Sequence, residues 1–157
     1  MRRRAILLGL IVLLAGACGS DSNKPLSKEE YGAEVGSVLR PLQNKILPGV
    51  IATSPAEGTR AVERLRDAEH MCREGGDKLA GLRPPDDAAA AHNQLVDGLR
   101  RLADEVGRMR KGAERGNFLR LEQFKVQAAS DPGFAQIRSA VGQLIGLGYS
   151  SIVGQGP

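Results

Sequence analysis

The feature that most constrains the fold is a long apolar stripe in the segment 88–113. Its side chains recur every three or four residues, which is the spacing of one helix face in a bundle: Ala88, Ala91, Leu95, Leu99, Leu102, Val106, Met109 and Ala113. The opposite face is charged, and ion pairs are expected between residues four apart: Asp97–Arg101, Arg100–Asp104, Arg101–Glu105 and Asp104–Arg108. No stretch alternates polar and apolar residues for long enough to predict a sheet. The sequence therefore predicts an all-α fold.

A first helix is predicted to begin at Ser27 and to end at Pro48-Gly49. Ser27 and Glu30 have the spacing of a capping box, in which each side chain bonds the other residue's backbone N–H. Pro41 interrupts the helix, because proline lacks the N–H and clashes with the preceding turn. We therefore expect a kink or a break near Val38.

A second helix is predicted over residues 55–82. Ser54 and Glu57 form its capping box, and Pro84-Pro85 end it. Asp86 or Asp87 is expected to cap the third helix, over 87–112, because a carboxylate is favourable at a helix N-terminus.

A fourth arm is predicted over residues 117–146, broken near Asp131-Pro132, a pair typical of a helix start. Residues 147–157 are rich in Gly and Ser and are expected to form a loose tail, in which Tyr149 and Ile152 are able to pack back onto the core. Helices roughly 40–45 Å long joined by short turns imply antiparallel neighbours. The predicted architecture is an antiparallel, up-down-up-down four-helix bundle over residues 27–146.

The first 17 residues have the pattern of a secretory signal peptide. Arg2, Arg3 and Arg4 precede the uncharged run 5–17, which is shorter than the roughly 20 apolar residues of a transmembrane helix. The end of this run, Leu14-Ala15-Gly16-Ala17-Cys18, resembles a bacterial lipobox. The resemblance implies that residues 1–17 are removed and that Cys18 carries a diacylglyceryl group. It also implies a lipid anchor on the extracytoplasmic face of the cell membrane, with residues 18–26 as a flexible tether.

Other processing routes stay open at the same residues. Lipoboxes usually have Leu where Ala15 stands, and Ala15-Gly16-Ala17 also suits an ordinary signal peptidase, which would give a soluble secreted protein. Arg3-Arg4 has the faint pattern of a twin-arginine signal. The Gly-, Ala- and Arg-rich remainder resembles helical lipoproteins of high-GC Gram-positive bacteria, and this resemblance implies no activity.

The charge of the chain argues against a nucleic-acid partner. The chain has 22 Lys and Arg residues against 18 Asp and Glu, and three of the cations are Arg2, Arg3 and Arg4. Without them the charges nearly balance, so the basic footprint of a nucleic-acid-binding protein is absent.

Few residues have the chemistry of a metal or cofactor site. Folding the hairpin about Pro84-Pro85 separates Cys72 from His92 by about 7 Å along the axis, and His70 lies further away. Two ligands of one zinc ion bind it at about 2 to 2.3 Å, so no metal site is expected, and no cofactor. His92 is expected to form a surface pair with Asp77, and Cys72 to be a buried, reduced, structural thiol.

Two classes of function remain. The first is a non-catalytic envelope lipoprotein whose bundle binds a partner protein, a wall polymer or a small apolar ligand. The second is an enzyme with a site assembled from scattered Asp, Glu and Arg residues. The sequence has no recognisable nucleophile or metal constellation, which favours the first class.

One basic cluster is a candidate partner-binding surface. Arg108, Arg110, Lys111 and Arg115 are expected at the end of the bundle away from the tether, with Lys45 nearby. They would attract an anionic partner such as a wall polymer. The alternative is that these cations only stabilise the C-terminus of their helix.

Overall fold

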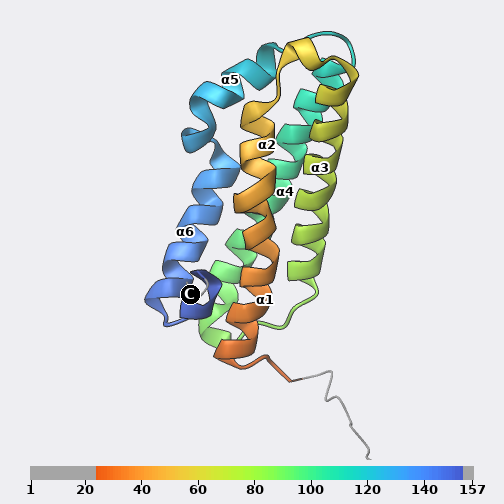
Figure 1. Cartoon of the computed structure of the whole chain (residues 1–157). Coiled ribbons are helices and arrows are strands. Elements are labelled where there is room, and N and C mark those ends of the chain that lie inside the picture. Colours follow the sequence, from red (N-terminus) through yellow and green to blue (C-terminus); the bar gives the residue numbers. More distant parts are fainter. Residues whose placement is uncertain (1–23, 154–157) are drawn as a thin grey trace, which may run out of the picture.

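The computed structural model describes residues 24–153, and every regular element in that range is helical. The predicted signal peptide, Cys18 and residues 154–157 lie outside the described residues. The elements, labelled in Figure 1, are α1 (Lys28–Pro41), the π-helical η1 (Leu42–Ile46), α2 (Leu47–Ala52), η2 (Pro55–Glu57), α3 (Thr59–Ala80), η3 (Asp86–Ala88), α4 (Ala89–Ala113), α5 (Leu119–Gln127), η4 (Ala128–Ser130), α6 (Pro132–Gly146) and η5 (Ser150–Val153). The prediction of an all-α fold is confirmed.

Three helix starts follow the predicted capping chemistry. The Ser27 hydroxyl accepts a hydrogen bond from the Glu30 N–H, and the Glu30 carboxylate accepts one from the Ser27 N–H. Ser54 caps the short helix η2 in the same way, and α3 then begins after Gly58, whose φ of 54° suits glycine. The Asp131 carboxylate accepts from the backbone at the start of α6.

The predicted cap of the third helix is wrong. No side chain caps η3 or α4, although Asp86 and Asp87 lie in the first turn of η3. Asp87 instead accepts hydrogen bonds from Lys28 at 2.6 Å and from the Tyr149 hydroxyl at 2.5 Å. Because its carboxylate binds these two long-range partners, Asp87 does not cap the helix.

The irregularity caused by Pro41 lies later than predicted. α1 continues past Val38 to Pro41, and the next five residues form the π-helical turn η1. There the Leu47 N–H bonds the Leu42 carbonyl, five residues back rather than four. Pro41 and Pro48 bracket this wide turn, and neither has an N–H to complete a regular α-helical ladder.

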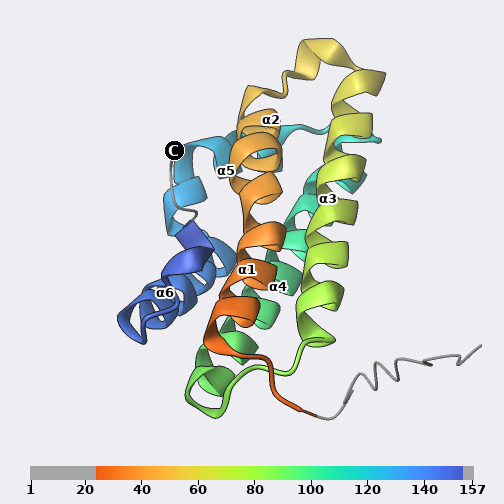
Figure 2. The same cartoon turned by 60° about the horizontal axis from the view of Figure 1, so that its bottom comes forward.

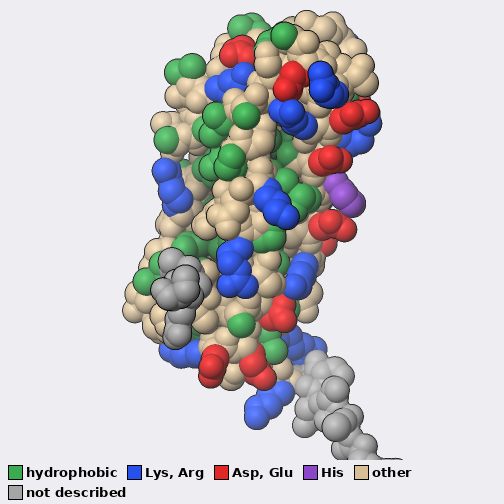
Figure 3. Space-filling view, viewed as in Figure 1, with side chains coloured by type: hydrophobic (Ala, Val, Ile, Leu, Met, Phe, Trp, Pro, Cys, Tyr) green, Lys and Arg blue, Asp and Glu red, His purple; other side chains and the backbone are tan. Residues whose placement is uncertain are grey.

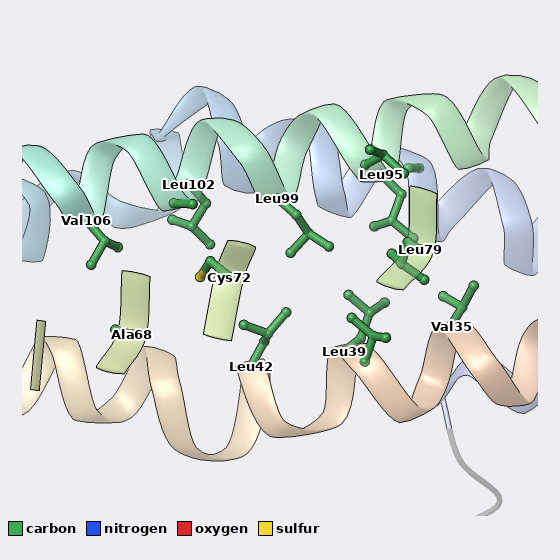
Figure 4. Packing of buried hydrophobic residues seen from close by; sticks show 14 of the residues in the cluster. Val35, Leu39, Leu42, Ala68, Cys72, Leu79, Leu95, Leu99, Leu102 and Val106 are labelled. Carbon is green, nitrogen blue, oxygen red and sulfur yellow. The ribbon is translucent and has the colours of Figure 1, made fainter. Parts of the chain in front are cut away.

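α4 is the central element of the fold. It packs along α3 on one side and along α6 on the other, while α1 and α2 lie over α3. Figures 1 and 2 show α1–α2 in front of α4, between α3 and α6. Buried aliphatic side chains of α1, η1, α3 and α4 point toward one another in a single core (Figure 4).

The segment after α6 fills the space between α1 and α6 at one end of the molecule. Tyr149 and Ile152 are 1% and 4% exposed, so they pack back onto the core, as the sequence analysis allows for these two residues. η5 lies against α1 where Gly32 and Gly36 allow close approach: a Cβ on Gly36 would lie 3.1 Å from the Ser151 carbonyl oxygen. Ser151 and Ile152 lie this close to α1 because it has glycines at these two positions.

A polar pair is buried at the same end. His92 is 5% exposed and its Nδ1 lies 3.0 Å from the Tyr31 hydroxyl oxygen, so the expected surface pair with Asp77 is wrong. His92 directly follows Ala91, at the edge of the apolar stripe, and Tyr31 satisfies its polar atom. Burial lowers the pKa of His92 and raises that of Tyr31 to about 12.

Candidate functional site

The described part of the chain contains an apolar groove of about 510 Å³. One wall comes from the end of α1, from η1 and from α2, and the other from α5, η4 and the first turns of α6. Leu102 and Val106 of α4 and Cys72 of α3 form its floor. Figure 3 shows apolar side chains gathered on this face, between α2 and α5–α6. We call this hollow the groove.

The groove exists because its two walls do not close on each other. At one end of the molecule, Tyr149 and Ile152 occupy the space between α1 and α6. Beyond them the wall formed by α5, η4 and α6 has small side chains at Ala128 and Ala129, next to the break between helices at Asp131. The wide turn η1 contributes Leu42, Gln43 and Ile46 to the opposite wall, and π-helical turns are frequent at functional sites.

Apolar side chains extend the groove onto its two edges. Ile51 of α2 is 44% exposed and Val126 of α5 is 85% exposed, and both belong to the groove lining. Single exposed apolar residues are ordinary, but a pair flanking an apolar hollow makes one continuous apolar surface. A bound apolar molecule would cover both side chains.

The charged residues of the groove lining are both cations. Lys125 pairs with Glu122 at 2.8 Å, outside the groove. Arg138 donates a hydrogen bond to the main-chain carbonyl of Ala129 and has no ion-pair partner among the described residues. No Asp or Glu lines the groove.

The floor of the groove holds a buried thiol, as predicted for Cys72. Its side chain is 0% exposed, and burial raises its pKa to about 12. A thiol in such surroundings stays protonated and unreactive at neutral pH. Cys72 therefore shapes the floor and supplies no nucleophile.

Two residues of the predicted basic cluster are engaged in ion pairs within the molecule. Arg108 pairs with Glu105 at 2.6 Å, while Arg110 pairs with Glu69 at 2.8 Å and with Glu114 at 2.6 Å. The two other members of the cluster, Lys111 and Arg115, are exposed, and no ion pair to either is found among the described residues. The free charge of the cluster is therefore about half of what the sequence indicates.

None of the four ion pairs predicted along one face of the third helix is found among the described residues; Glu105 pairs with Arg108 on the same helix, and several of these side chains pair across helices. Asp104 meets Arg73 of α3, and Glu105 accepts from Arg120 of α5 at 2.7 Å. Burial alone would raise the pKa of Glu69, but hydrogen bonds and charge from Arg110 and Arg73 outweigh it and the pKa is lowered. Partners on other helices compete well with partners four residues away in the same helix, because they also satisfy the partly buried carboxylates of Glu69 and Glu105.

The candidate metal ligands are dispersed. Within residues 24–153 no three His, Cys, Asp or Glu side chains are placed to hold a metal ion. His70 lies 3.5 Å from Glu74, while His92 bonds Tyr31. A smaller polar hollow beside α5 contains Glu105 and Asp131, but both carboxylates already serve the ion pairs and the helix cap described above.

No protein-family model, curated protein or solved structure matches this chain. No helix in the part of the chain that the structure describes is both long and apolar enough to cross a membrane. The groove is therefore the candidate functional site. One indirect sign of the groove is visible in the sequence, because Val126 is an apolar residue off the stripe of its helix.

Proposed function

We propose that this chain is a non-catalytic, lipid-anchored protein of the cell envelope, and that its helical domain binds a small apolar ligand in the groove. The observation that carries the proposal is the groove itself. Its volume of about 510 Å³ lies within the range of about 300–1,000 Å³ typical of small-molecule sites. Its lining is mostly aliphatic and aromatic, with polar groups only at Gln43, Lys125 and Arg138.

The anchor in this proposal is a diacylglyceryl group on Cys18, and its support is the lipobox-like sequence. The described chain begins near the turn between α3 and α4, where the Leu26 N–H bonds the Arg83 carbonyl. α2 and α5, which carry much of the groove, lie toward the other end of the molecule (Figure 1). A tether at the first end would hold the groove away from the membrane.

The proposed architecture has four antiparallel arms in up-down-up-down order: α1–α2, α3, α4 and α5–α6. Its support is the extensive packing of α4 against α3 and α6, together with the short connections between consecutive arms. In this order the break at Asp131-Pro132 divides the fourth arm and sets one wall of the groove.

The other functions considered have weaker support. A wall polymer or envelope protein bound at Lys111 and Arg115 would meet only the unpaired half of the basic cluster. The alternative enzyme, with a site assembled from Asp, Glu and Arg residues, would gather several carboxylates in a pocket, and the groove lining contains none.

Photo-crosslinking with a neutral apolar probe tests ligand binding. The full chain in lipid nanodiscs is irradiated with a diazirine-bearing long-chain alcohol, and the labelled peptides are mapped by mass spectrometry. We expect labels on peptides containing Leu102, Val106 and Phe124, competed by the unlabelled alcohol. Labels spread evenly over the surface, or confined to another face, would contradict the proposal.

Substitutions at the exposed edges provide the matched comparison. Ile51→Asp and Val126→Asp place charge beside the groove at exposed positions, so folding is preserved while groove labelling falls severalfold. Leu119→Asp is the control, because Leu119 is 64% exposed on α5 but lies outside the groove lining. This control keeps wild-type labelling.

A further inference from the structure

We infer that the ligand of the groove is a single-chain amphiphile with a carboxylate head group, such as a long-chain carboxylic acid. This inference rests on the proposed function and adds the chemical class of the ligand. The charge of the groove carries it: the charged residues of its lining are Lys125 and Arg138, and no acidic residue joins them. Over the whole chain, by contrast, the numbers of basic and acidic residues are similar, at 22 and 18.

The two cations lie on the same wall. Arg138 of α6 donates to the carbonyl of Ala129 in η4, and Lys125 of α5 precedes Ala129 by four residues. The rest of that wall is apolar, with Phe124, Phe134 and Ile137. A cationic edge above an apolar surface complements an anionic head group on an apolar chain, since charge-assisted hydrogen bonds to a carboxylate are among the stronger ones.

These cations are available to a ligand, unlike Arg110 in the basic cluster. Arg110 is held by two carboxylates, Glu69 and Glu114. Arg138 has no carboxylate partner among the described residues. Lys125 has one, Glu122; the two side chains are 20% and 50% exposed, and an ion pair in contact with solvent contributes little free energy, so a ligand carboxylate is able to compete with Glu122.

The size of the groove favours one chain over two. Its volume of about 510 Å³ is that of a site for one drug-sized molecule. A head group of one or two oxygens suffices to engage Arg138, while the apolar lining from Leu39 to Ile137 takes the chain. A free carboxylic acid meets both conditions.

The test compares two photoreactive probes that differ only in the head group, a diazirine-bearing palmitic acid and the corresponding alcohol. Both are titrated against the full chain in lipid nanodiscs, and the labelled groove peptides are quantified by mass spectrometry. We expect the acid to half-saturate the groove at about tenfold lower concentration, which corresponds to about 1.4 kcal/mol. Arg138→Gln removes most of that preference, and Lys125→Gln reduces it.

Arg101→Gln is the control, because Arg101 is exposed on α4 and lies outside the groove lining. It leaves the preference for the acid unchanged. Equal labelling by acid and alcohol, unaltered by Arg138→Gln, would overturn the inference about the head group and leave the proposed function standing. Absence of groove labelling by both probes would overturn the proposed function itself.

Discussion

At the scale of single residues, burial decides the chemistry of the two most reactive side chain types in the domain. Cys72 is fully buried in the same apolar core as Leu42 and Leu102 (Figure 4), so its thiol behaves as a small apolar group. His92 is enclosed with Tyr31, which supplies its hydrogen bond. Neither residue needs a ligand to account for its position.

Cys72 is expected to react slowly with alkylating reagents until the protein unfolds. Burial raises its pKa to about 12, so the thiolate is scarce at neutral pH. Mass spectrometry of the Cys72 peptide, with and without denaturant, measures the rate of alkylation; fast labelling of the native chain would show that the thiol is exposed.

Cys72→Ala is expected to lower the free energy of unfolding by about 1 kcal/mol, through a small cavity. Cys72→Asp would cost several kcal/mol by burying an unpaired charge.

His92 is expected to make stability depend on pH below about 6.5, the ordinary pKa of histidine. Burial lowers its pKa in the folded state, so as the pH falls the unfolded state binds the proton first and the free energy of unfolding decreases. Chemical denaturation at pH 7.5 and at pH 5.5 measures the change. His92→Gln retains a polar side chain but removes the titration, so it should lose less stability over this range. An equal loss of stability in the wild type and the variant between pH 7.5 and pH 5.5 would contradict a lowered pKa for His92.

At the scale of elements, α4 and α6 approach closely through a pair of glycines. A Cβ on Gly133 would lie 3.0 Å from both the Gly98 carbonyl oxygen and the Leu102 N. A Cβ on Gly98 would lie 2.8 Å from a carbon of the Ile137 side chain. This contact fixes α6 against α4, and α6 carries Ile137 and Arg138 into the groove wall.

Gly133→Ala is expected to destabilise the fold by about 1–3 kcal/mol, because the new methyl group meets backbone atoms that cannot rotate away. Gly142→Ala is the matched control on the same helix. Nothing lies within 4 Å of its Cβ, and replacing a helical glycine there should stabilise the protein by up to about 1 kcal/mol. Thermal unfolding of both variants gives the comparison, and equal shifts of both would contradict the close packing.

The ends of several elements could be predicted because local chemistry sets them. Ser27, Ser54 and Asp131 cap helices in the structure as their sequence neighbours indicate. Asp87 could not be assigned this way, because its partners Lys28 and Tyr149 come from distant parts of the chain. The same holds for His92, because its partner Tyr31 is 61 residues away.

At the scale of the whole molecule, the groove depends on how the first and fourth arms pack against each other, which local sequence patterns do not predict. It lies where the α1–α2 and α5–α6 walls separate, beyond the end filled by Tyr149 and Ile152. The sequence predicts the buried stripes of these helices, and Val106 and Cys72 were expected inside. It does not predict that the stripes of the first and fourth arms leave a space between them.

Anchoring is also a property of the whole molecule. Cys18→Ala should release the chain from the membrane or leave it as an unprocessed precursor, because the two acyl chains of a diacylglyceryl group are needed for firm binding. Membrane fractionation measures this, with Cys72→Ala as the control that stays anchored. Membrane association of a cleaved Cys18→Ala chain would contradict the lipoprotein assignment.

The most direct test of ligand binding is methyl NMR of the full chain in lipid nanodiscs, titrated with dodecanoate. The groove predicts saturable shifts of the methyl groups of Leu102, Val106 and Ile137, which line it. The methyl groups of Leu79 and Leu95, buried outside the lining, should move little. Unchanged methyl groups at Leu102, Val106 and Ile137 under saturating dodecanoate would contradict the account.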